Sequence, residues 1–126
     1  MKKMLMIDND CVSCEQAQHA LENEYEITIA SSVWTAPELL NTASFDLILL
    51  DLCLPGINGI DFLKEFVKKD EHPPVILTSS DNAVETEING LDAGASDFIH
   101  KPYSSAVLKA RVDRIIAHAD LMKNLS

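Results

Sequence analysis

The sequence predicts one α/β domain, a doubly wound five-stranded parallel sheet with helices on both of its faces. The order of the apolar segments is the first reason, because short apolar runs alternate with stretches in which apolar residues recur at helical spacing. Residues 47–50 are the second, since all of them are apolar, as expected of a strand that helices cover on each side. The 126 residues fit a single domain of ordinary size.

The elements follow one another in strict alternation. Strands are predicted at residues 3–7, 27–31, 47–50, 75–78 and 97–100. Helices are predicted at residues 11–23, 36–43, 59–69, 83–93 and 105–125. Polar residues mark several helix starts: Asp10 and Ser104 can cap the first and last helices, and Thr35 suits the second because a proline follows in its first turn. Asn82, with a glutamate three residues later, reads as a capping box for the fourth.

The last predicted helix is unusually long. An apolar stripe runs along it, formed by Leu108, Val112, Ile115, Ala119 and Met122. Two interpretations stay open: a helix that faces the core and frays at its end, or a helix that leads into a partner chain or a removed output domain. We therefore predict a domain over residues 1–117 and a C-terminal extension of the last helix over residues 118–126.

The composition excludes some classes of function. A formal charge of −10 repels phosphate backbones, so direct binding of nucleic acid by this domain is not expected. No apolar run approaches the ~20 residues of a membrane span, and the N-terminus does not read as a signal peptide. The three cysteines then indicate reduced thiols in a cytoplasm, and we expect Cys11, Cys14 and Cys53 to be small buried packing residues rather than a redox centre.

Polar side chains follow several of the predicted strands. They are Asp8, Asn9 and Asp10 after the first strand, Asp51 after the third, Ser79 after the fourth, and Lys101 and Pro102 after the fifth. Ligands of such sheets bind beyond the carboxyl ends of the strands, so these groups should meet at one edge. Carboxylates brought close together repel unless a cation lies between them, and oxygen ligands in an open site suit Mg²⁺.

This arrangement indicates phosphoryl chemistry. Asp51 is the natural nucleophile, because it directly follows an apolar strand. Mg²⁺ and Lys101 would neutralise charge on the oxygens of a phosphoryl group during its transfer, and Ser79 offers a hydroxyl that can bond one of those oxygens afterwards.

Four stretches carry a resemblance to a known family. They are MLMIDND at residues 4–10, DLILLDLCLPG at 46–56, PVILTSS at 74–80 and GASDFIHKPY at 94–103. In this order and spacing the chain resembles the receiver domains of two-component response regulators, which are CheY-like, from residue 4 to about residue 116. The resemblance implies a flavodoxin-like (βα)5 fold with strand order 2-1-3-4-5.

The resemblance also implies roles for single residues. Asp51 is the implied phosphoacceptor, Lys101 its partner ammonium and Ser79 the switch hydroxyl. Phe98 matches the aromatic residue whose side chain follows that hydroxyl, and the Lys101–Pro102 peptide bond is expected to be cis.

One departure from the family concerns the metal. The family usually has two acids after the first strand, and here Asp8 keeps the first while Asn9 stands at the second. With Asp8 and Asp51, the backbone carbonyl of Cys53 is the implied further Mg²⁺ ligand. An amide oxygen carries no charge, so Asn9 should weaken Mg²⁺ binding, and Asp10 could compensate if the loop rotates.

The resemblance implies a response regulator receiver in two-component phosphorelay signalling. It would take a phosphoryl group from the phosphohistidine of a sensor histidine kinase or phosphotransfer protein, and catalyse its own phosphorylation and dephosphorylation. A face made by the fourth helix, fifth strand and fifth helix would then bind an output domain or a second copy, with Asp97 and Arg111 as a candidate pair across a dimer.

Two alternatives remain at this stage. Asn9 favours a phosphorylation-independent pseudo-receiver that works as a binding module. A more remote one is a haloacid-dehalogenase-like phosphatase with Asp8 as nucleophile and Asp10 as general acid, although that family needs a longer chain with a later acidic pair.

Overall fold

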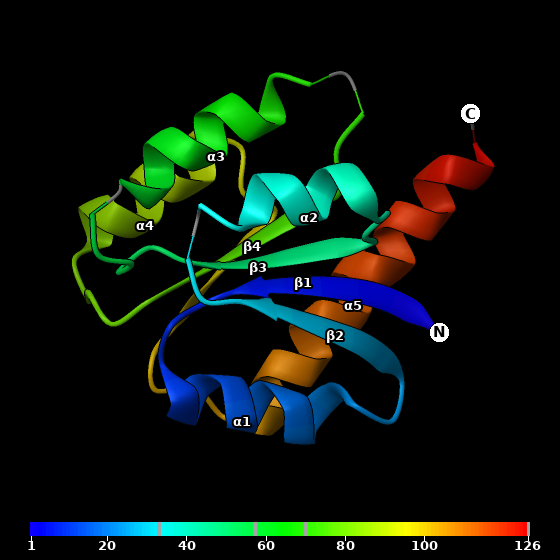
Figure 1. Ribbon diagram of the computed structural model, residues 1–126, viewed down its shortest axis with the longest axis horizontal. Coiled ribbons are helices and arrows are strands. Elements are labelled where there is room, and N and C mark those ends of the chain that lie inside the picture. Colours follow the sequence, from blue (N-terminus) through cyan, green and yellow to red (C-terminus); the bar gives the residue numbers. More distant parts are fainter. Residues whose placement is uncertain (33, 57, 70, 126) are drawn as a thin grey trace.

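The computed structural model describes residues 1–32, 34–56, 58–69 and 71–125 (Figure 1). Within these residues one parallel sheet has the strand order β2-β1-β3-β4-β5. Its strands are β1 (Lys2–Ile7), β2 (Tyr25–Ala30), β3 (Leu47–Asp51), β4 (Val75–Ser79) and β5 (Asp97–His100). The helices are α1 (Cys11–Leu21), α2 (Ala36–Thr42), α3 (Gly59–Val67), α4 (Val84–Asp92) and α5 (Ser105–Asn124). The predicted doubly wound (βα)5 fold and its strand order are confirmed.

Two apolar layers hold the sheet between its helices. On one face, Met4 and Met6 of β1 pack with buried residues of α1 and α5. On the other, Leu5 and Ile7 pack with buried residues of α2 and α3. Successive residues of a strand point to opposite faces, so a strand covered on both sides must be apolar throughout, as β3 is up to its last residue.

The caps of the first and last helices are confirmed. Asp10 accepts a hydrogen bond from the N–H of Val12 at 3.1 Å, and Ser104 accepts one from Val107 at 3.4 Å. Thr35 stands at the cap position of α2 without a side-chain cap bond, because its hydroxyl donates back to the carbonyl of Ser32 at 3.0 Å.

The capping box predicted for α4 is wrong. The helix begins one residue later than predicted, with Ala83 at the cap position and no side-chain bond from that residue. Asp81 provides the side-chain hydrogen bonds at the start of α4. Its carboxylate accepts the N–H of Ala83 at 2.9 Å and the hydroxyl of Thr86 at 2.7 Å. An acid two residues before the cap therefore bonds the first turn in place of Asn82.

Helix α5 is continuous from Ser105 to Asn124. The inner part of its predicted stripe is buried, whereas Met122 is 52% exposed, because the end of the helix extends past the sheet (Figure 1). An ion pair of 2.7 Å between Lys2 and Asp120 still joins this end to β1. The boundary between residues 117 and 118 stays a prediction. In the described part of the chain, no helix combines the length and apolar character that crossing a membrane requires.

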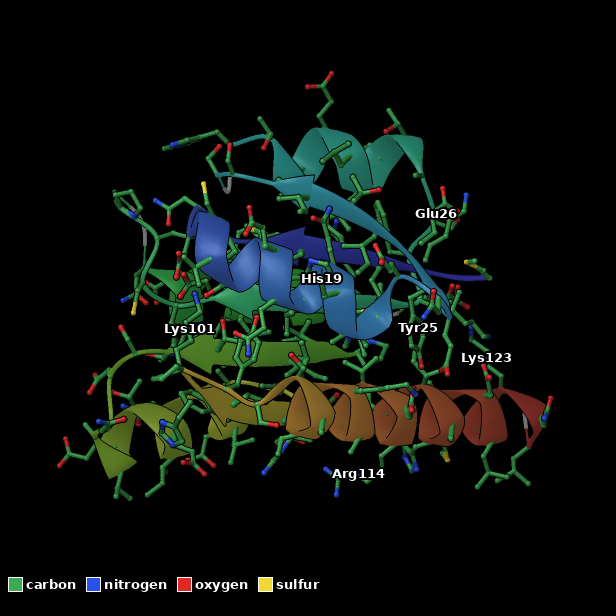
Figure 2. All side chains as sticks on the ribbon, turned by 90° about the horizontal axis from the view of Figure 1, so that it is seen from below. His19, Tyr25, Glu26, Lys101, Arg114 and Lys123 are labelled. Atoms are coloured by element: carbon green, nitrogen blue, oxygen red, sulfur yellow. The ribbon has the colours of Figure 1, made fainter. Side chains whose placement is uncertain are left out.

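The residues proposed as a charged pair across a dimer also form an ion pair within the single chain. Arg111 Nη1 lies 3.1 Å from Asp97 Oδ1, and Arg114 Nη2 lies 2.9 Å from Asp97 Oδ2. Asp97 opens β5 and both arginines lie on α5, so the acid has two partners without a second copy. Figure 2 shows Arg114 on α5.

Candidate functional site

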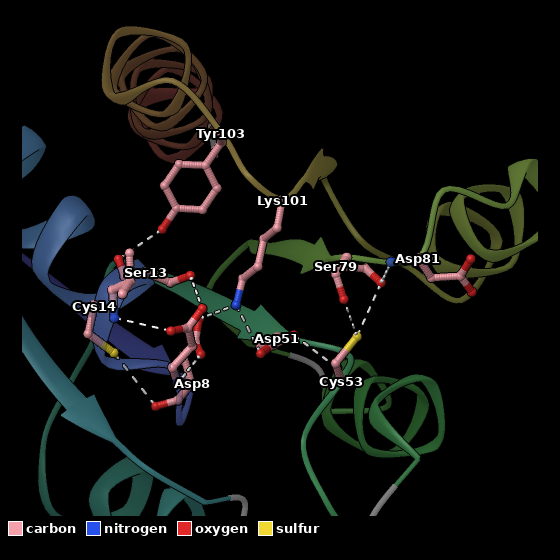
Figure 3. A network of polar contacts seen from close by, with 12 residues as sticks. Asp8, Ser13, Cys14, Asp51, Cys53, Ser79, Asp81, Lys101 and Tyr103 are labelled. Atoms are coloured by element: carbon pink, nitrogen blue, oxygen red, sulfur yellow. Dashed lines mark hydrogen bonds and ion pairs between the residues drawn. The ribbon is translucent and has the colours of Figure 1, made fainter.

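The carboxyl ends of four strands meet at one end of the sheet. Asp8 directly follows β1, Asp51 ends β3, Ser79 ends β4, and Lys101 directly follows β5. Figure 3 shows these four side chains close together, and Figure 2 shows Lys101 at the end of the sheet opposite Tyr25. Asp8 and Asp51 are buried, with 1% and 3% of their surface exposed. The parallel order of the strands therefore brings together groups that are far apart in the sequence.

A lysine bridges the two buried acids. Lys101 Nζ donates to Asp8 Oδ2 at 2.8 Å and to Asp51 Oδ2 at 3.0 Å. The remaining carboxylate oxygens accept backbone N–H groups, from Asp10 to Asp8 at 2.8 Å and from Cys53 to Asp51 at 2.9 Å. Every carboxylate oxygen of the pair thus has a donor.

The bridge leaves one negative charge uncompensated, since two carboxylates share one ammonium. Burial raises the pKa of Asp8, although the hydrogen bond from Lys101 opposes it. Burial alone would lower the pKa of Lys101, but its hydrogen bonds to Asp8 and Asp51 outweigh burial and raise it. The pocket therefore favours a further cation near the carboxylates.

The oxygen atoms of this pocket fit Mg²⁺, although they carry fewer negative charges than a site with three acids would. Among the described residues, no group of three or more acidic, histidine or cysteine side chains could hold a metal by itself. A site built on Asp8 and Asp51 would need neutral oxygens to complete it, and Mg²⁺ accepts such a set because it commonly binds through one or two carboxylates and keeps several waters. Asn9 and Cys53, the residues expected to supply neutral oxygens, both line the pocket beside Asp51.

Asp10 caps α1 in this structure, and its support of a metal stays a prediction. Its Oδ2 accepts the hydroxyl of Ser13 at 2.8 Å, while Oδ1 accepts the N–H of Val12. The hydrogen bond from Ser13 is the main reason that the pKa of Asp10 lies below its usual range. The carboxylate is therefore engaged in capping α1.

The Ser79 hydroxyl is bonded away from Asp51 in this structure. It accepts the N–H of Asp81 at 3.0 Å and lies 3.5 Å from Cys53 Sγ (Figure 3). Phe98 is 4% exposed and packs in the core layer on the α2 and α3 face. A Cβ atom at Gly90 of α4 would lie 2.6 Å from the Leu77 side chain, so the glycine lets α4 approach the sheet closely beside Phe98. The Lys101–Pro102 peptide bond is cis.

Sequence reasoning missed the residues that close the pocket between α1 and the segment after β5. An open cavity of about 390 Å³ is lined there by Gln16 and Tyr103 as well as by Asp51 and Lys101. Tyr103 donates its hydroxyl to the carbonyl of Ser13 at 3.1 Å, and Gln16 donates its side-chain amide to the Tyr103 carbonyl. Burial raises the pKa of Tyr103 to about 12, so the hydroxyl remains a donor. The position of Tyr103 directly after Lys101-Pro102 was the feature of the sequence that could have identified it.

The expectation of buried cysteines is wrong for two of the three. Cys11 and Cys53 are exposed, and Cys14 is half-buried. Cys11 is the first residue of α1 and Cys53 lies in the loop after β3, so neither belongs to a strand that supplies the core. Partial burial alone would raise the pKa of the Cys53 thiol, but hydrogen bonds with the Ser79 and Ser80 hydroxyls outweigh burial and lower it. Burial raises the pKa of Cys14 to about 11.

We therefore expect Cys53 to react with iodoacetamide at least ~10-fold faster than Cys14 near pH 8, because the reactive thiolate is far more populated at Cys53. Peptide mass spectrometry over a time course measures both rates in one sample without added metal. A Cys14→Ser variant is the control and should leave the rate at Cys53 unchanged. Equal rates at the two positions would contradict the different environments of the two thiols.

Comparisons with known proteins agree with this geometry. The family model described as the response regulator receiver domain matches residues 4–113. Over 116 residues the chain is 35% identical to the transcriptional regulatory protein PmrA of Pectobacterium parmentieri, covering 90% of this chain and 52% of that protein. It is also 35% identical over 116 residues to the uncharacterized transcriptional regulatory protein YcbL of Bacillus subtilis, covering 91% of this chain and 51% of that one. The chain thus spans about half the length of these curated relatives.

Solved structures give the same result. The receiver domain of the Francisella response regulator 1452 is 30% identical, with a TM-score of 0.85 over 94% of this chain and 98% of that chain. A CheY-like receiver domain protein from Methanospirillum hungatei has a TM-score of 0.88 at 24% identity over 97% of this chain and 98% of that one, which shows the shared fold. The match of the family model to most of the chain, together with these relatives, shows that this chain belongs to the receiver domains of two-component response regulators, which act in signal transduction.

Proposed function

We propose that Asp51 accepts a phosphoryl group from the phosphohistidine of a sensor histidine kinase or phosphotransfer protein. The observation that carries the proposal is the Asp8–Lys101–Asp51 bridge at the edge of the sheet. The side chain of Asp51 is 4% exposed, yet it lines the open cavity, so a donor can reach it. An oxygen of Asp51 attacks phosphorus while the P–N bond of the donor breaks, and the electron pair leaves with the imidazole nitrogen, which takes up a proton.

The residues around Asp51 would stabilise the phosphoryl group during its transfer. Lys101 already donates to Asp51, and its ammonium can follow the charge onto a phosphoryl oxygen. Asp8, Asp51, the Asn9 amide oxygen and the Cys53 carbonyl would hold Mg²⁺, which when bound neutralises charge on the transferring group. Water later hydrolyses the acyl phosphate, so the domain catalyses its own phosphorylation and dephosphorylation.

The signal then passes to a partner in the cytoplasm. The Ser79 hydroxyl exchanges the N–H of Asp81 for a phosphoryl oxygen, and the face made by α4, β5 and α5 changes its preferred partner. Exposed apolar side chains support this face as a contact surface, among them Val84, Ile88 and Leu91 of α4. An output domain or a second copy is the proposed occupant, and the net charge of −10 argues against nucleic acid as a direct partner of this domain.

An Asp51→Asn variant tests the proposal. Intact-mass spectrometry after treatment with acetyl phosphate and Mg²⁺ is expected to show one added phosphoryl group on the wild type and none on the variant, because the amide cannot act as the nucleophile. Asp61→Asn is the matched control, since Asp61 is an exposed acid of α3, and it should be labelled like the wild type. Labelling of Asp51→Asn would refute the assignment of the acceptor.

The pseudo-receiver hypothesis has its own outcome in the same experiment. If the wild type stays unlabelled while Asn9→Asp is labelled, the natural chain is a phosphorylation-independent binding module. The phosphatase hypothesis built on Asp8 loses its support, because Asp8 shares the Lys101 ammonium with Asp51 and Asp10 is occupied as a helix cap.

A further inference from the structure

Helix α4 is attached to the sheet by two polar contacts that both begin next to Ser79. The first is a chain of two hydrogen bonds. The Ser79 hydroxyl accepts the N–H of Asp81, and the Asp81 carboxylate accepts the hydroxyl of Thr86 at 2.7 Å. For the second, His100 is the direct partner of Ser79 in the β4–β5 register, and His100 Nε2 lies 2.8 Å from Glu87 Oε1. Thr86 and Glu87 are consecutive residues near the start of α4. The beginning of this helix is thus tied to the switch position from two sides.

The geometry of the histidine ring makes Glu87 its polar anchor. A carboxylate only accepts hydrogen bonds, so Nε2 of His100 donates to Glu87. Within the described residues, the other ring nitrogen, Nδ1, is buried and has no hydrogen-bond partner. The ring also contacts Phe98, with centroids 5.1 Å apart and planes at 57°. Glu87 and the switch aromatic together therefore set where the ring lies.

Resting on the proposed function, we infer that His100 is a positioning residue that transmits the movement of Ser79 to α4. Lys101 N–H donates to the Ser79 carbonyl at 2.8 Å, so a backbone hydrogen bond joins the end of β4 to the residue that follows β5. When Ser79 turns toward a phosphoryl group on Asp51, Asp81 loses its bond to the Ser79 hydroxyl and His100 shifts with its strand.

The contact with Glu87 is suited to such a switch. The two side chains are 41% and 43% exposed, so water can replace either partner, and the contact can break and form again at small cost. A helix that is held by weak contacts at its first turn changes position more readily than one that is buried, and α4 buries only Gly90 among its residues.

Hydrogen exchange of α4 tests the inference. The variants His100→Leu and Glu87→Ala remove the contact from either side, and both are expected to speed amide exchange at residues 84–89 by roughly 2- to 5-fold. Glu65→Gln is the matched control: it removes an exposed ion pair of 2.9 Å with Lys68 on α3 and should leave α4 unchanged. Unchanged α4 exchange in both variants would overturn the inference.

Beryllofluoride with Mg²⁺ then separates coupling from simple packing. In the wild type it is expected to alter α4 exchange, and in His100→Leu this response should be lost while labelling of Asp51 by acetyl phosphate persists. His100→Gln should restore the response, because its amide can donate to Glu87. An equal α4 response in wild type and His100→Leu would refute the coupling and leave the proposed function intact. Absence of Asp51 labelling in the wild type would refute the proposed function, and the inference with it.

Discussion

Replacing Lys101 with methionine is expected to lower the free energy of unfolding by about 3–5 kcal/mol in the absence of Mg²⁺. The variant keeps the apolar stem of the side chain and removes the ammonium that bridges Asp8 and Asp51. Two carboxylates whose side chains are 1% and 4% exposed then face each other with backbone donors alone. Such an uncompensated buried charge is among the most destabilising changes a single substitution makes.

Urea denaturation measures this effect. Lys68→Met serves as the control, because its ion pair with Glu65 is exposed on both sides, and it should cost less than ~0.5 kcal/mol. Mg²⁺ is expected to restore part of the stability that the Lys101 variant loses, since it supplies the missing positive charge. A loss below ~1 kcal/mol without metal would show that solvent already neutralises the acids.

The cost of this variant should also depend on pH. Burial already raises the pKa of Asp8 in the folded protein, and removing Lys101 removes a hydrogen bond that opposes the rise. An acid whose pKa is raised on folding gains stability as the pH falls through that pKa. The deficit relative to the wild type should therefore be largest at neutral pH and shrink in the acidic range.

An Asn9→Asp variant is expected to bind Mg²⁺ about 30-fold more tightly. Asn9 is exposed at the edge of the pocket, so its interactions are screened by water. One added charge at about 4 Å from a divalent ion is worth about 2 kcal/mol under those conditions, which corresponds to that factor. Without metal the same change adds a third carboxylate and should destabilise the protein slightly.

Magnesium titration followed by the thermal transition measures both effects. Asn23→Asp is the control, since it adds the same charge at an exposed position before β2, away from the pocket. It should leave the Mg²⁺ affinity unchanged. An unchanged affinity in Asn9→Asp would show that the side chain at position 9 does not reach the ion.

The fold could be predicted because alternation is a property of long segments. Strands buried on both faces need continuous apolar runs, and the parallel order then places Asp8, Asp51 and Lys101 at one edge whatever their spacing in the sequence. What could not be predicted is how single polar groups choose among nearby partners. The Asp10 cap of α1 was predictable, whereas at α4 the carboxylate of Asp81 bonds the first turn in place of Asn82, because local backbone geometry decides between neighbouring polar residues.

The long-range contacts of charged residues were equally hidden. Asp97 finds two arginines of its own chain, and His100 reaches Glu87 on a neighbouring helix. Neither contact has a periodicity or spacing that a sequence pattern can report, because each depends on which helix packs beside β5. The exposure of Cys53 likewise depends on the path of the loop after β3.

The lysine bridge holds the two acids together without a metal ion. We therefore expect the domain to fold when Mg²⁺ is absent. Asn9 is exposed at the rim and takes no part in this bridge, so we expect substitutions there to change ion affinity more than stability. Ion affinity and architecture are then separately adjustable properties of the domain.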